Sequence, residues 1–329
     1  MKTDMVLAFD IGGSFLKAAL VDTLGRVQRE ERLSLPQRME EALASLLSLA
    51  KNLTDSGQLP LAGIGIGAPG AIDHAGCAIG GDSGNLPQLI GIKFDELFSS
   101  YAVPVRIDND ATNAARGEYL FGAARGMHNA LIVTLGTGIG GGLILNGKIY
   151  AGAASYAGEF GHLIVEAHGR RCTCGGSGCI EAYASAWALR LRAADLVRRC
   201  PESSLASLAS GGGGNPKGIE VSDIMAAAAS GDALARGIAY EAADMLGIAF
   251  ASAANLLNLN AIVVGGGIAA AGEVLFEPLR ASFRRNTLPK AFAACTLIPA
   301  ELGNKAGLAG AAALIFDREE ANGKGTAKT

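Results

Sequence analysis

The chain has 329 residues, of which 50% are hydrophobic and 18% are charged, and its formal net charge is −3 at pH 7. This composition is ordinary for a packed protein with one large or two smaller domains. The weakly acidic balance gives no electrostatic basis for binding nucleic acid or an anionic membrane, so we expect neither partner. Aromatic residues are scarce while Gly and Ala are abundant, which favours an α/β architecture.

The start of the chain, MKTDMVLAFDIGG, does not read as a secretory signal, because Asp4 and Asp10 interrupt the apolar run. We therefore expect a cytoplasmic protein whose cysteines stay reduced. Residues 245–272 carry no charge and are long enough to span a bilayer, but asparagines and a triple glycine lie among them. A helix ending at about Asn258, a turn and a buried strand is the better interpretation.

Strands and helices alternate from the first residues onward. Residues 5–35 predict three strands, with turns at Gly12-Gly13 and Leu24-Gly25, and residues 39–57 predict a helix. The first half continues with a buried strand that enters a glycine turn (61–70), a short helix (94–101) and a strand that runs into a helix (103–122).

The same pattern restarts near residue 130. The second half comprises a strand–turn–strand hairpin (130–150), a long helix (232–258), and then strand, helix, strand and helix (261–267, 272–286, 295–300 and 305–316). Because each half opens with a glycine-cornered hairpin, we predict a duplicated α/β unit. The cleft between two such units is a natural ligand site.

Three glycine corners are candidate phosphate sites, namely DIGGSFLK (10–17), LGTGIGGG (135–142) and VVGGGIA (263–269). Glycine lets several backbone N–H groups approach an anion, although any single corner is more typical of a plain tight turn. A hairpin from each half is expected to hold nucleotide phosphates, with Asp10 orienting Mg²⁺ through water. Ser14 and Lys17 follow on the outgoing strand, where Lys17 is either a phosphate ligand or an ordinary exposed lysine.

Two familiar nucleotide motifs match only in part. GTGIGG (136–141) and GIGAPG (65–70) fit the dinucleotide pattern G-x-G-x-x-G, but a strand follows the first and a proline interrupts the second. GLILNGKI (142–149) resembles a P-loop, yet Ile149 replaces the hydroxyl that would ligate magnesium. Neither motif is expected to act in its usual role.

A metal site is predicted by the spacing H-x9-C-x-C-x4-C, formed by His162, Cys172, Cys174 and Cys179. Three thiolates and one imidazole make a closed tetrahedral zinc site without an open position for a catalytic water. The alternative is a set of unrelated buried thiols. The zinc would pin a long loop, so that the flanking Glu159 and Glu181 are held rigidly and can accept hydrogen bonds from a polyhydroxylated ligand such as a sugar.

The segment IDNDATNAARGE places Asn109 and Asp110 where a strand ends and a helix begins. Asp108 or Asp110 could simply cap that helix. The functional interpretation is that Asp110 accepts a proton from a sugar hydroxyl while Asn109 binds a neighbouring one. One aspartate that orients the nucleophile is the minimum that phosphoryl transfer requires.

Together these segments resemble the ROK family of repressors, open reading frames and sugar kinases. The matching stretches include DIGGSFLKAALVD, GIGAPG, IDNDATNAARGE, TLGTGIGGGLILNGKIYAG, GEFGHLIV and RCTCGGSGCIEAYAS, and they extend from residue 6 to about 316. The region 130–185 is the most specific, because the corner, the Glu-x-x-His and the cysteine cluster occur in order. The sequence departs from the family pattern at Ser14, where threonine is usual, and at Phe160, where isoleucine is frequent.

The resemblance implies a two-domain actin-like, ribonuclease H-like (hexokinase-type) fold with an interdomain cleft. It assigns the base to Asp110 and the zinc to the four residues named above. The family roles that it carries to this sequence fall into two sets. Sugar contacts are implied for Asn109, Asp110, Glu159, His162, Glu181, Gly70 and Asn85. Nucleotide contacts are implied for Asp10, Gly12, Gly13, Ser14, Lys17, Thr137, Gly138, Gly266 and Gly267.

On this basis we expect a small domain of residues 1–117 plus 305–329 and a large domain of residues 118–304 that carries the zinc. The implied reaction is phosphorylation of the 6-hydroxyl of a hexose by ATP with Mg²⁺, in a homodimer or homotetramer. Sugar-responsive repressors of the family carry a preceding helix-turn-helix, for which we expect no room before the first strand. A sugar-binding protein without catalysis is disfavoured because Asp110 is present.

Glucose is the expected substrate, since GNLPQLIGIKFDELF (84–98) resembles the loop of the family's glucokinases. N-acetylmannosamine, N-acetylglucosamine, fructose and allose remain alternatives, because tolerance at one sugar carbon depends on pocket shape. Polyphosphate is an alternative donor.

Overall fold

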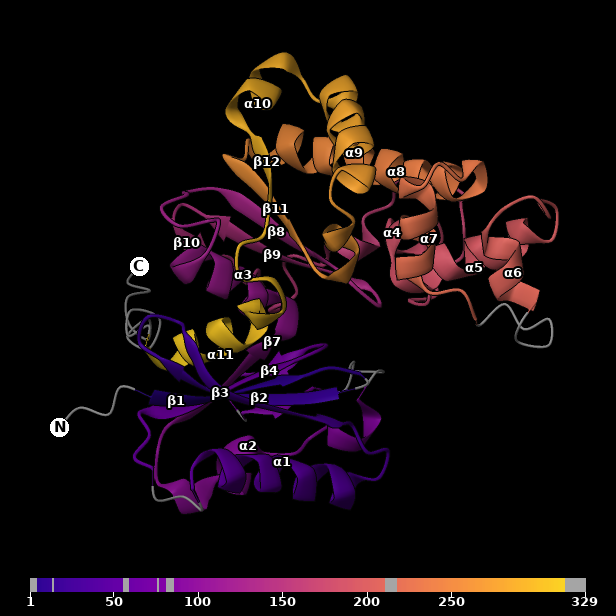
Figure 1. Ribbon diagram of the computed structural model, residues 1–329. Helices are drawn as coiled ribbons and strands as arrows, with labels where there is room; N and C mark the ends of the chain where they lie inside the picture. Colours follow the sequence, from indigo (N-terminus) through magenta and orange to yellow (C-terminus); the bar gives the residue numbers. More distant parts are fainter. Residues whose placement is uncertain are drawn as a thin grey trace. The chain divides into compact units, whose positions relative to one another are not determined.

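The computed structural model describes residues 5–13, 15–55, 59–75, 77–80, 86–210 and 218–316. The chain divides into two compact units. The first consists of Met1–Gly126, Ile149–Ala157 and Leu302–Thr329, and the second of Met127–Lys148 and Gly158–Glu301. Each unit contains a five-stranded sheet (Figure 1).

The elements of the first unit are β1 (Met5–Ile11), β2 (Phe15–Asp22), β3 (Val27–Ser34), α1 (Met39–Leu53), β4 (Gly63–Ala68), β5 (Ile72–Asp73), β6 (Ala78–Ile79), α2 (Phe94–Leu97), β7 (Val105–Asn109), α3 (Asp110–Phe121) and α11 (Ala306–Phe316). The second unit and its border contain β8 (Ala130–Leu135), β9 (Ile139–Leu145), β10 (Lys148–Ile149), α4 (Glu181–Ala184), α5 (Ala186–Val197), α6 (Leu205–Ser210), α7 (Val221–Ala229), α8 (Ala233–Leu257), β11 (Ala261–Gly265), α9 (Glu273–Asn286), α10 (Pro289–Ala294) and β12 (Thr296–Pro299).

The two sheets have the same strand order. In the first the order is β3-β2-β1-β4-β7, and in the second it is β10-β9-β8-β11-β12. The opening hairpin is antiparallel in both, and the two later strands join parallel to the first strand of the hairpin. This repetition confirms the predicted duplication of an α/β unit.

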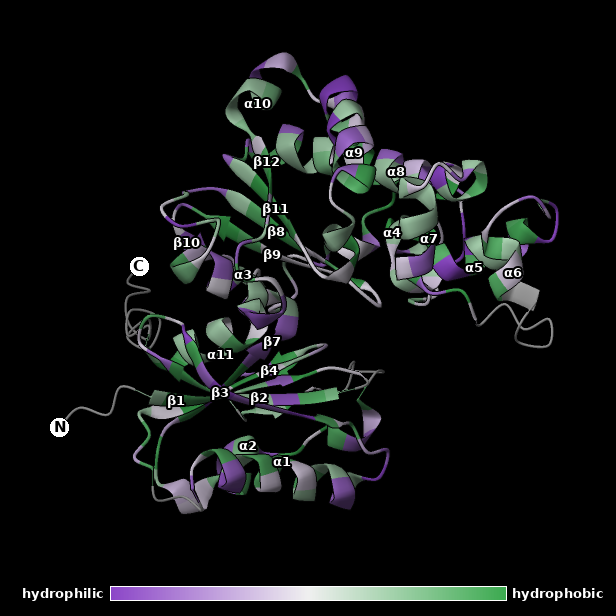
Figure 2. Ribbon diagram, in the orientation of Figure 1, coloured by the Kyte–Doolittle hydropathy of each residue, from purple (hydrophilic) through white to green (hydrophobic). Residues whose placement is uncertain are grey.

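The sheet of the first unit is covered on both faces. Leu7, Phe9 and Ile11 belong to the hydrophobic cluster that contains α1, whereas Val6 and Ala8 pack with α11. This follows from the period of two along β1, which turns alternate side chains to opposite faces. Helix α1 carries both colours in Figure 2, because its hydrophobic residues are buried and its charged residues face solvent.

Glycines allow α11 to pack closely in the first unit. A Cβ atom at Gly310 would lie 1.6 Å from the carbonyl oxygen of Asn113 on α3, and one at Gly65 on β4 would lie 1.9 Å from that of Ala311. Larger residues at these positions would force the helix away from its neighbours. The close packing fixes α3, the helix that begins with Asp110.

Helix α8 forms the centre of the hydrophobic cluster of the second unit. It begins after Asp232, whose side chain accepts the N–H of Ala235, and ends at Asn258, which adopts the left-handed conformation with φ 51°. Strand β11 follows and is fully buried. The helix, turn and strand predicted within 245–272 are therefore confirmed, and no helix among the described residues has the length and hydropathy needed to cross a membrane.

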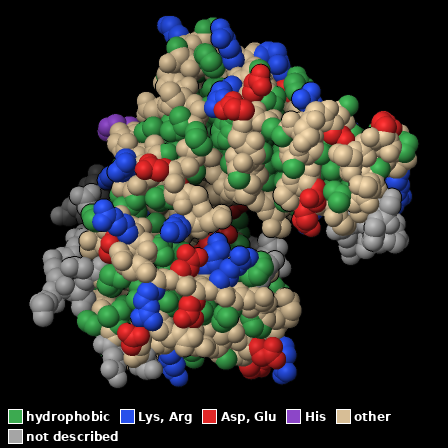
Figure 3. Space-filling view, in the orientation of Figure 1, with side chains coloured by type: hydrophobic (Ala, Val, Ile, Leu, Met, Phe, Trp, Pro, Cys, Tyr) green, Lys and Arg blue, Asp and Glu red, His purple; other side chains and the backbone are tan. Residues whose placement is uncertain are grey.

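The surface carries charges of both signs. On the face drawn in Figure 3, Lys and Arg side chains lie among Asp and Glu side chains. This mixture fits the net charge of −3.

Candidate active site and metal centre

The four predicted metal ligands lie together in the second unit. One ligand atom from each of His162, Cys172, Cys174 and Cys179 lies within 4.8 Å of the others. The Sγ atoms of Cys174 and Cys179 are 3.8 Å apart, and Cys172 Sγ is 3.8 Å from His162 Nδ1. Zinc–sulfur bonds of about 2.3 Å in a tetrahedron would place two sulfurs about 3.8 Å apart. The cluster therefore has the donor set and spacing that fit a structural zinc ion.

The backbone around the ligands depends on glycine. Gly175 and Gly178 have φ angles of 90° and 81°, and a Cβ atom at Gly178 would lie 1.9 Å from the carbonyl oxygen of Glu166. Burial raises the pKa of the Cys179 thiol to about 12. A cation must displace that proton to bind the sulfur, so metal binding here is coupled to proton release.

We call residues 159–179, which contain the four metal ligands, the metal loop. Glu159 and His162 lie at its start. His162 has its Nδ1 towards the sulfur cluster and its Nε2 3.9 Å from the Glu159 carboxylate. Burial raises the pKa of Glu159, while His162 opposes this shift and Glu181 adds to it. The Glu-x-x-His pair thus joins a metal ligand to a predicted sugar ligand, as expected of a metal-bound imidazole with a second free nitrogen.

Glu181 lies between the metal loop and a glycine corner. Its side chain is 9% exposed and stands at the start of α4. Oε2 accepts the backbone N–H of Ile139 at 2.9 Å, and Oε1 accepts the hydroxyl of Thr173 at 3.2 Å. The sequence predicted Glu181 as a sugar ligand but did not predict either of these partners.

The two glycine corners of the second unit lie beside each other. Strands β8 and β11 are parallel neighbours, with Thr134 opposite Gly265, so the corners that follow them lie at one edge of the sheet. A Cβ atom at Gly266, where φ is 88°, would lie 2.3 Å from the carbonyl oxygen of Leu135. Corners more than 100 residues apart in sequence therefore meet at one edge of the sheet.

A pocket of about 720 Å³ opens at these corners. Its wall combines Thr137 with Gly267 and adds residues from α5, from α7 and from the N-cap of α7, none of which lies in a glycine corner. These additional residues include Arg190, Glu220, Ser222 and Met225. The pocket is larger and less polar than a phosphate alone requires, and it suits a nucleotide base and sugar.

In the first unit, Asn109 and Asp110 occupy the junction of β7 and α3. Asn109 is the N-cap, because its Oδ1 accepts the N–H groups of Ala111 and Thr112 at 2.9 and 3.1 Å. Asp110 is the first helical residue, so the cap is neither Asp108 nor Asp110. The Nδ2 of Asn109 donates to the carbonyl oxygen of Gly70 at 3.3 Å, which brings two predicted sugar contacts together.

Asp110 is held in a constrained position. Its Oδ1 accepts the N–H of Ala111 at 2.8 Å, and the helix N-terminus favours a negative charge there. Helix α3 is fixed beneath it by Asn113, which donates to the carbonyl oxygen of Ile66 at 3.1 Å, and by the buried pair of Arg116 with Asp108 at 3.0 Å.

The first glycine corner follows β1 in the same unit. Asp10 pairs in register with Lys17 of β2, and the two side chains form an ion pair of 2.9 Å. Lys17 is therefore engaged with Asp10 and is only 26% exposed. Gly12 donates its N–H to the carbonyl oxygen of Phe15 at 2.9 Å, which closes the turn around Gly13. Ser14 and Asn85 lie outside the described residues.

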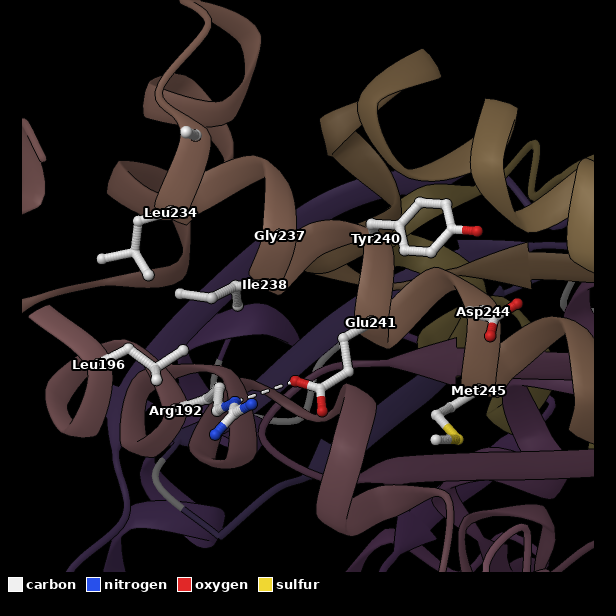
Figure 4. A pocket seen from close by; sticks show the side chains of 10 residues that line it. Arg192, Leu196, Leu234, Gly237, Ile238, Tyr240, Glu241, Asp244 and Met245 are labelled. Atoms are coloured by element: carbon white, nitrogen blue, oxygen red, sulfur yellow. Dashed lines mark hydrogen bonds and ion pairs between the residues drawn. The ribbon is translucent and has the colours of Figure 1, made fainter. Parts of the chain in front are cut away.

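A second anchor of the metal loop was not predicted. Glu241 on α8 pairs with Arg170, two residues before the first cysteine ligand, and with Arg192 on α5 at 3.0 Å. Figure 4 shows Arg192 and Glu241 pointing towards each other in a separate pocket of about 450 Å³. No local sequence signal marks these pairs, because Arg170 and Glu241 are 71 positions apart.

The chain is similar to known proteins over nearly its whole length. A family model described as ROK family matches residues 6–318. A glucokinase of Halalkalibacterium halodurans is 34% identical, over 96% of this chain and 96% of the relative. A glucokinase of Streptomyces coelicolor is also 34% identical, over 94% of this chain and 97% of the relative.

Solved structures of related proteins have the same fold as this chain. A ROK family glucokinase from Streptomyces griseus, crystallised in complex with glucose and AMPPNP, superposes with a TM-score of 0.82 at 35% identity. The superposition covers 94% of this chain and 98% of that protein. The predicted fold class, α/β of the actin-like, hexokinase type, is confirmed.

Proposed function

Because this chain belongs to the ROK family, we propose that it is an ATP-dependent hexose kinase that phosphorylates the 6-hydroxyl of glucose. The observation that carries the proposal is the coexistence of Asp110 at a strand–helix junction with a cysteine–histidine cluster flanked by Glu159 and Glu181. Near-full-length similarity to proteins described as glucokinases supports glucose as the sugar.

Asp110 is assigned the role of base. In the proposed step the 6-hydroxyl transfers its proton to the Asp110 carboxylate while its oxygen forms a bond to the γ-phosphorus of ATP. The bond from that phosphorus to the bridging oxygen breaks, and ADP leaves. A carboxylate fixed by the Ala111 N–H and by a rigid α3 is suited to positioning an alcohol, which is the main task of a protein in phosphoryl transfer.

The sugar and nucleotide contacts complete the proposal. Asn109, Gly70, Glu159, His162 and Glu181 are assigned to the sugar, together with Asn85. Backbone groups at Gly12, Gly13, Thr137, Gly138, Gly266 and Gly267 are assigned to ATP, together with Ser14 and Lys17. The 720 Å³ pocket beside Thr137 and Gly267 would take the adenosine. Asp10 would orient Mg²⁺ through water, since Mg²⁺ keeps much of its hydration when it bridges phosphates.

Further parts of the proposal concern organisation. We assign residues 1–117 with 305–329 to the small domain and residues 118–304 to the large domain. A cytoplasmic location, a homo-oligomeric state and the lack of a nucleic-acid partner also belong to the proposal, on the basis of composition and family resemblance.

The test is a coupled ADP-release assay with glucose, N-acetylmannosamine, N-acetylglucosamine, fructose and allose, giving kcat/KM for each. Glucose is expected to have the highest value with ATP. A higher kcat/KM for an N-acetylhexosamine would change the assigned substrate but leave the assignment as a sugar kinase intact. Absence of transfer to any of the five, with ATP and with polyphosphate as donors, would overturn the proposed function.

A further inference from the structure

The corner between β8 and β9 is held at two points by one short segment, residues 181–186. At one end the Glu181 carboxylate accepts the N–H of Ile139, the first residue of β9. At the other end Ala186 donates its N–H to the carbonyl oxygen of Gly136 at 2.9 Å. The corner therefore has the conformation that this segment imposes on it.

The segment is joined directly to the metal loop. Cys179 precedes Glu181 by two residues, and the carbonyl oxygen of Cys179 accepts the N–H of Ala182 at 3.0 Å. In addition, Thr173 lies between the ligands Cys172 and Cys174 and donates its hydroxyl to Glu181 Oε1. The Glu181 carboxylate thus bridges a residue of the metal loop and a residue of the glycine corner.

The contact between Glu181 and the corner leaves no free space. A Cβ atom at Gly138 would lie 2.6 Å from Glu181 Oε2, so a larger residue there would displace the carboxylate. Gly136 and Thr137 of the same corner line the 720 Å³ pocket. In the described part of the chain, the N–H groups of Thr137 and Gly138 have no hydrogen-bond acceptor, so they are available to an anion in that pocket.

We propose that Thr173 is a positioning residue that couples the metal loop to nucleotide binding through Glu181 and Ile139. This inference rests on the proposed function, since it takes the pocket to be the nucleotide site. Loss of the Thr173 hydroxyl removes one of the donors that fix the carboxylate, the others being the Ile139 N–H and the longer contact of Cys172 Sγ at 4.0 Å. Glu181 can then rotate away from Ile139, and the corner samples conformations in which its N–H groups diverge. The metal would therefore govern affinity for the nucleotide as well as for the sugar.

The experiment compares Thr173→Val with Thr173→Ser, which keeps the hydroxyl, and with the unaltered protein. The readouts are zinc content by elemental analysis and the Kd of AMPPNP by titration calorimetry without sugar. All four metal ligands remain in both variants, so about one zinc ion per chain is expected. We expect Thr173→Val to weaken AMPPNP binding by about three- to tenfold, as for loss of one hydrogen bond to a charged group. Thr173→Ser should restore binding.

A second measurement keeps the test decisive if Thr173→Val loses its zinc or fails to fold. The unaltered protein is stripped with a chelator below its unfolding temperature, and the Kd of AMPPNP is followed as zinc is returned. Affinity should rise with zinc occupancy. Unchanged AMPPNP affinity in zinc-loaded Thr173→Val, or in the stripped protein, overturns the coupling while leaving the kinase intact. If the unaltered protein binds no AMPPNP and transfers no phosphate, the proposed function itself fails.

Discussion

The two units share a sheet topology but obtain their functional groups in different ways. In the first unit two strands carry the polar residues at or near their ends, because Asp10 is the penultimate residue of β1 and β7 ends in Asn109, which Asp110 follows. In the second unit β8, β11 and β12 end in Leu135, Gly265 and Pro299. Its carboxylates flank the metal ligands that follow β10, because Glu159 precedes His162 and Glu181 follows Cys179.

The functional side chains are therefore positioned in two ways, by the packed sheet in the first unit and by a bound cation in the second. A strand end in a packed sheet is held by the elements around it, as the buried contacts of α3 and α11 show for the junction that carries Asp110. A long loop has no such support, and here the cysteine–histidine cluster and the Glu241 ion pairs take the place of a sheet. Variants of each unit should therefore fail in different ways.

The largest effect is expected in the first unit. Asp110→Asn should lower kcat by roughly 10²- to 10⁴-fold, because the amide cannot accept the proton. The Kd of the sugar should change little, since hydrogen bonding is kept, and the melting temperature should stay the same. The coupled assay and calorimetry measure both quantities.

Asp95→Asn is the matched control for this variant. Asp95 also lies in the first turn of a helix and accepts the N–H of the next residue, Glu96, at 2.9 Å. We expect unaltered kcat there. Turnover of Asp110→Asn equal to that of the control would remove Asp110 from the reaction.

The second unit should be sensitive to its cation. The protein is expected to contain about one zinc per chain, and chelation should destabilise the second unit by about 3 kcal/mol at moderate excess of metal over Kd. For a unit of this size that corresponds to a fall in Tm of roughly 6–12 °C. Thermal unfolding with and without chelator, together with elemental analysis, measures the effect.

Two cysteine variants make this test specific. Cys179→Ala removes a ligand and should abolish zinc binding and the response to chelator. Cys200→Ala removes a half-buried thiol outside the cluster and should keep both. Carefully purified protein that contains no zinc would contradict the assignment of the metal.

Substitution of one helix glycine in each unit tests how tightly the helices of the two units are packed. Gly310→Ala in α11 should lower the free energy of unfolding by about 2 kcal/mol, because the new Cβ overlaps the Asn113 carbonyl oxygen. Gly237→Ala in α8 meets no atom within 4 Å and should raise it by about 0.5–1 kcal/mol through higher helix propensity. Urea unfolding of both variants provides the values, and a stable Gly310→Ala would show that α11 is not fixed as described.

A further small effect concerns the start of α8. Burial opposes ionisation of Asp232, but backbone N–H groups of Ala235 and Ser204 and the hydroxyls of Ser203 and Ser204 lower its pKa to about 2. A lowered carboxyl pKa stabilises the fold at pH values above about 4, and this contribution is lost as the pH falls towards 2. Asp232→Ala should therefore cost about 1 kcal/mol at pH 7.

The pH dependence of this variant is the check. The difference in unfolding free energy between Asp232→Ala and the unaltered protein should shrink as urea titrations are moved from pH 7 to pH 3. A difference that stays constant over this range would mean that the cap acts through its shape and not through its charge.

Local spacing in the sequence was enough to predict much of this molecule. The hairpin glycines, the alternation along β1 and the cysteine spacing each reflect contacts within a few residues, and the structure contains them. The helix cap was harder. Asp108, Asn109 and Asp110 are all good cap residues, and only the register at which β7 ends makes Asn109 the cap.

Contacts between distant segments account for what the sequence did not predict. Helices α5 and α7 line the 720 Å³ pocket, and local signals for them exist in the Ser185 cap and the Glu220–Asp223 capping box. The partnership of Arg170 with Glu241 depends instead on how separate elements pack, and that of Thr173 with Glu181, eight residues apart, depends on how the loop around the metal ligands folds. A short sequence motif does not contain the information that would predict such contacts.

Phe160, between the two polar residues of the Glu-x-x-His pair, stacks on Phe250 of α8 with ring centroids 5.2 Å apart. An isoleucine at this position could not stack on the Phe250 ring. We therefore expect positions 160 and 250 to change together among relatives, so that both are aromatic or neither is. Replacing either phenylalanine alone should loosen the turn that carries Glu159, although all four metal ligands remain in place.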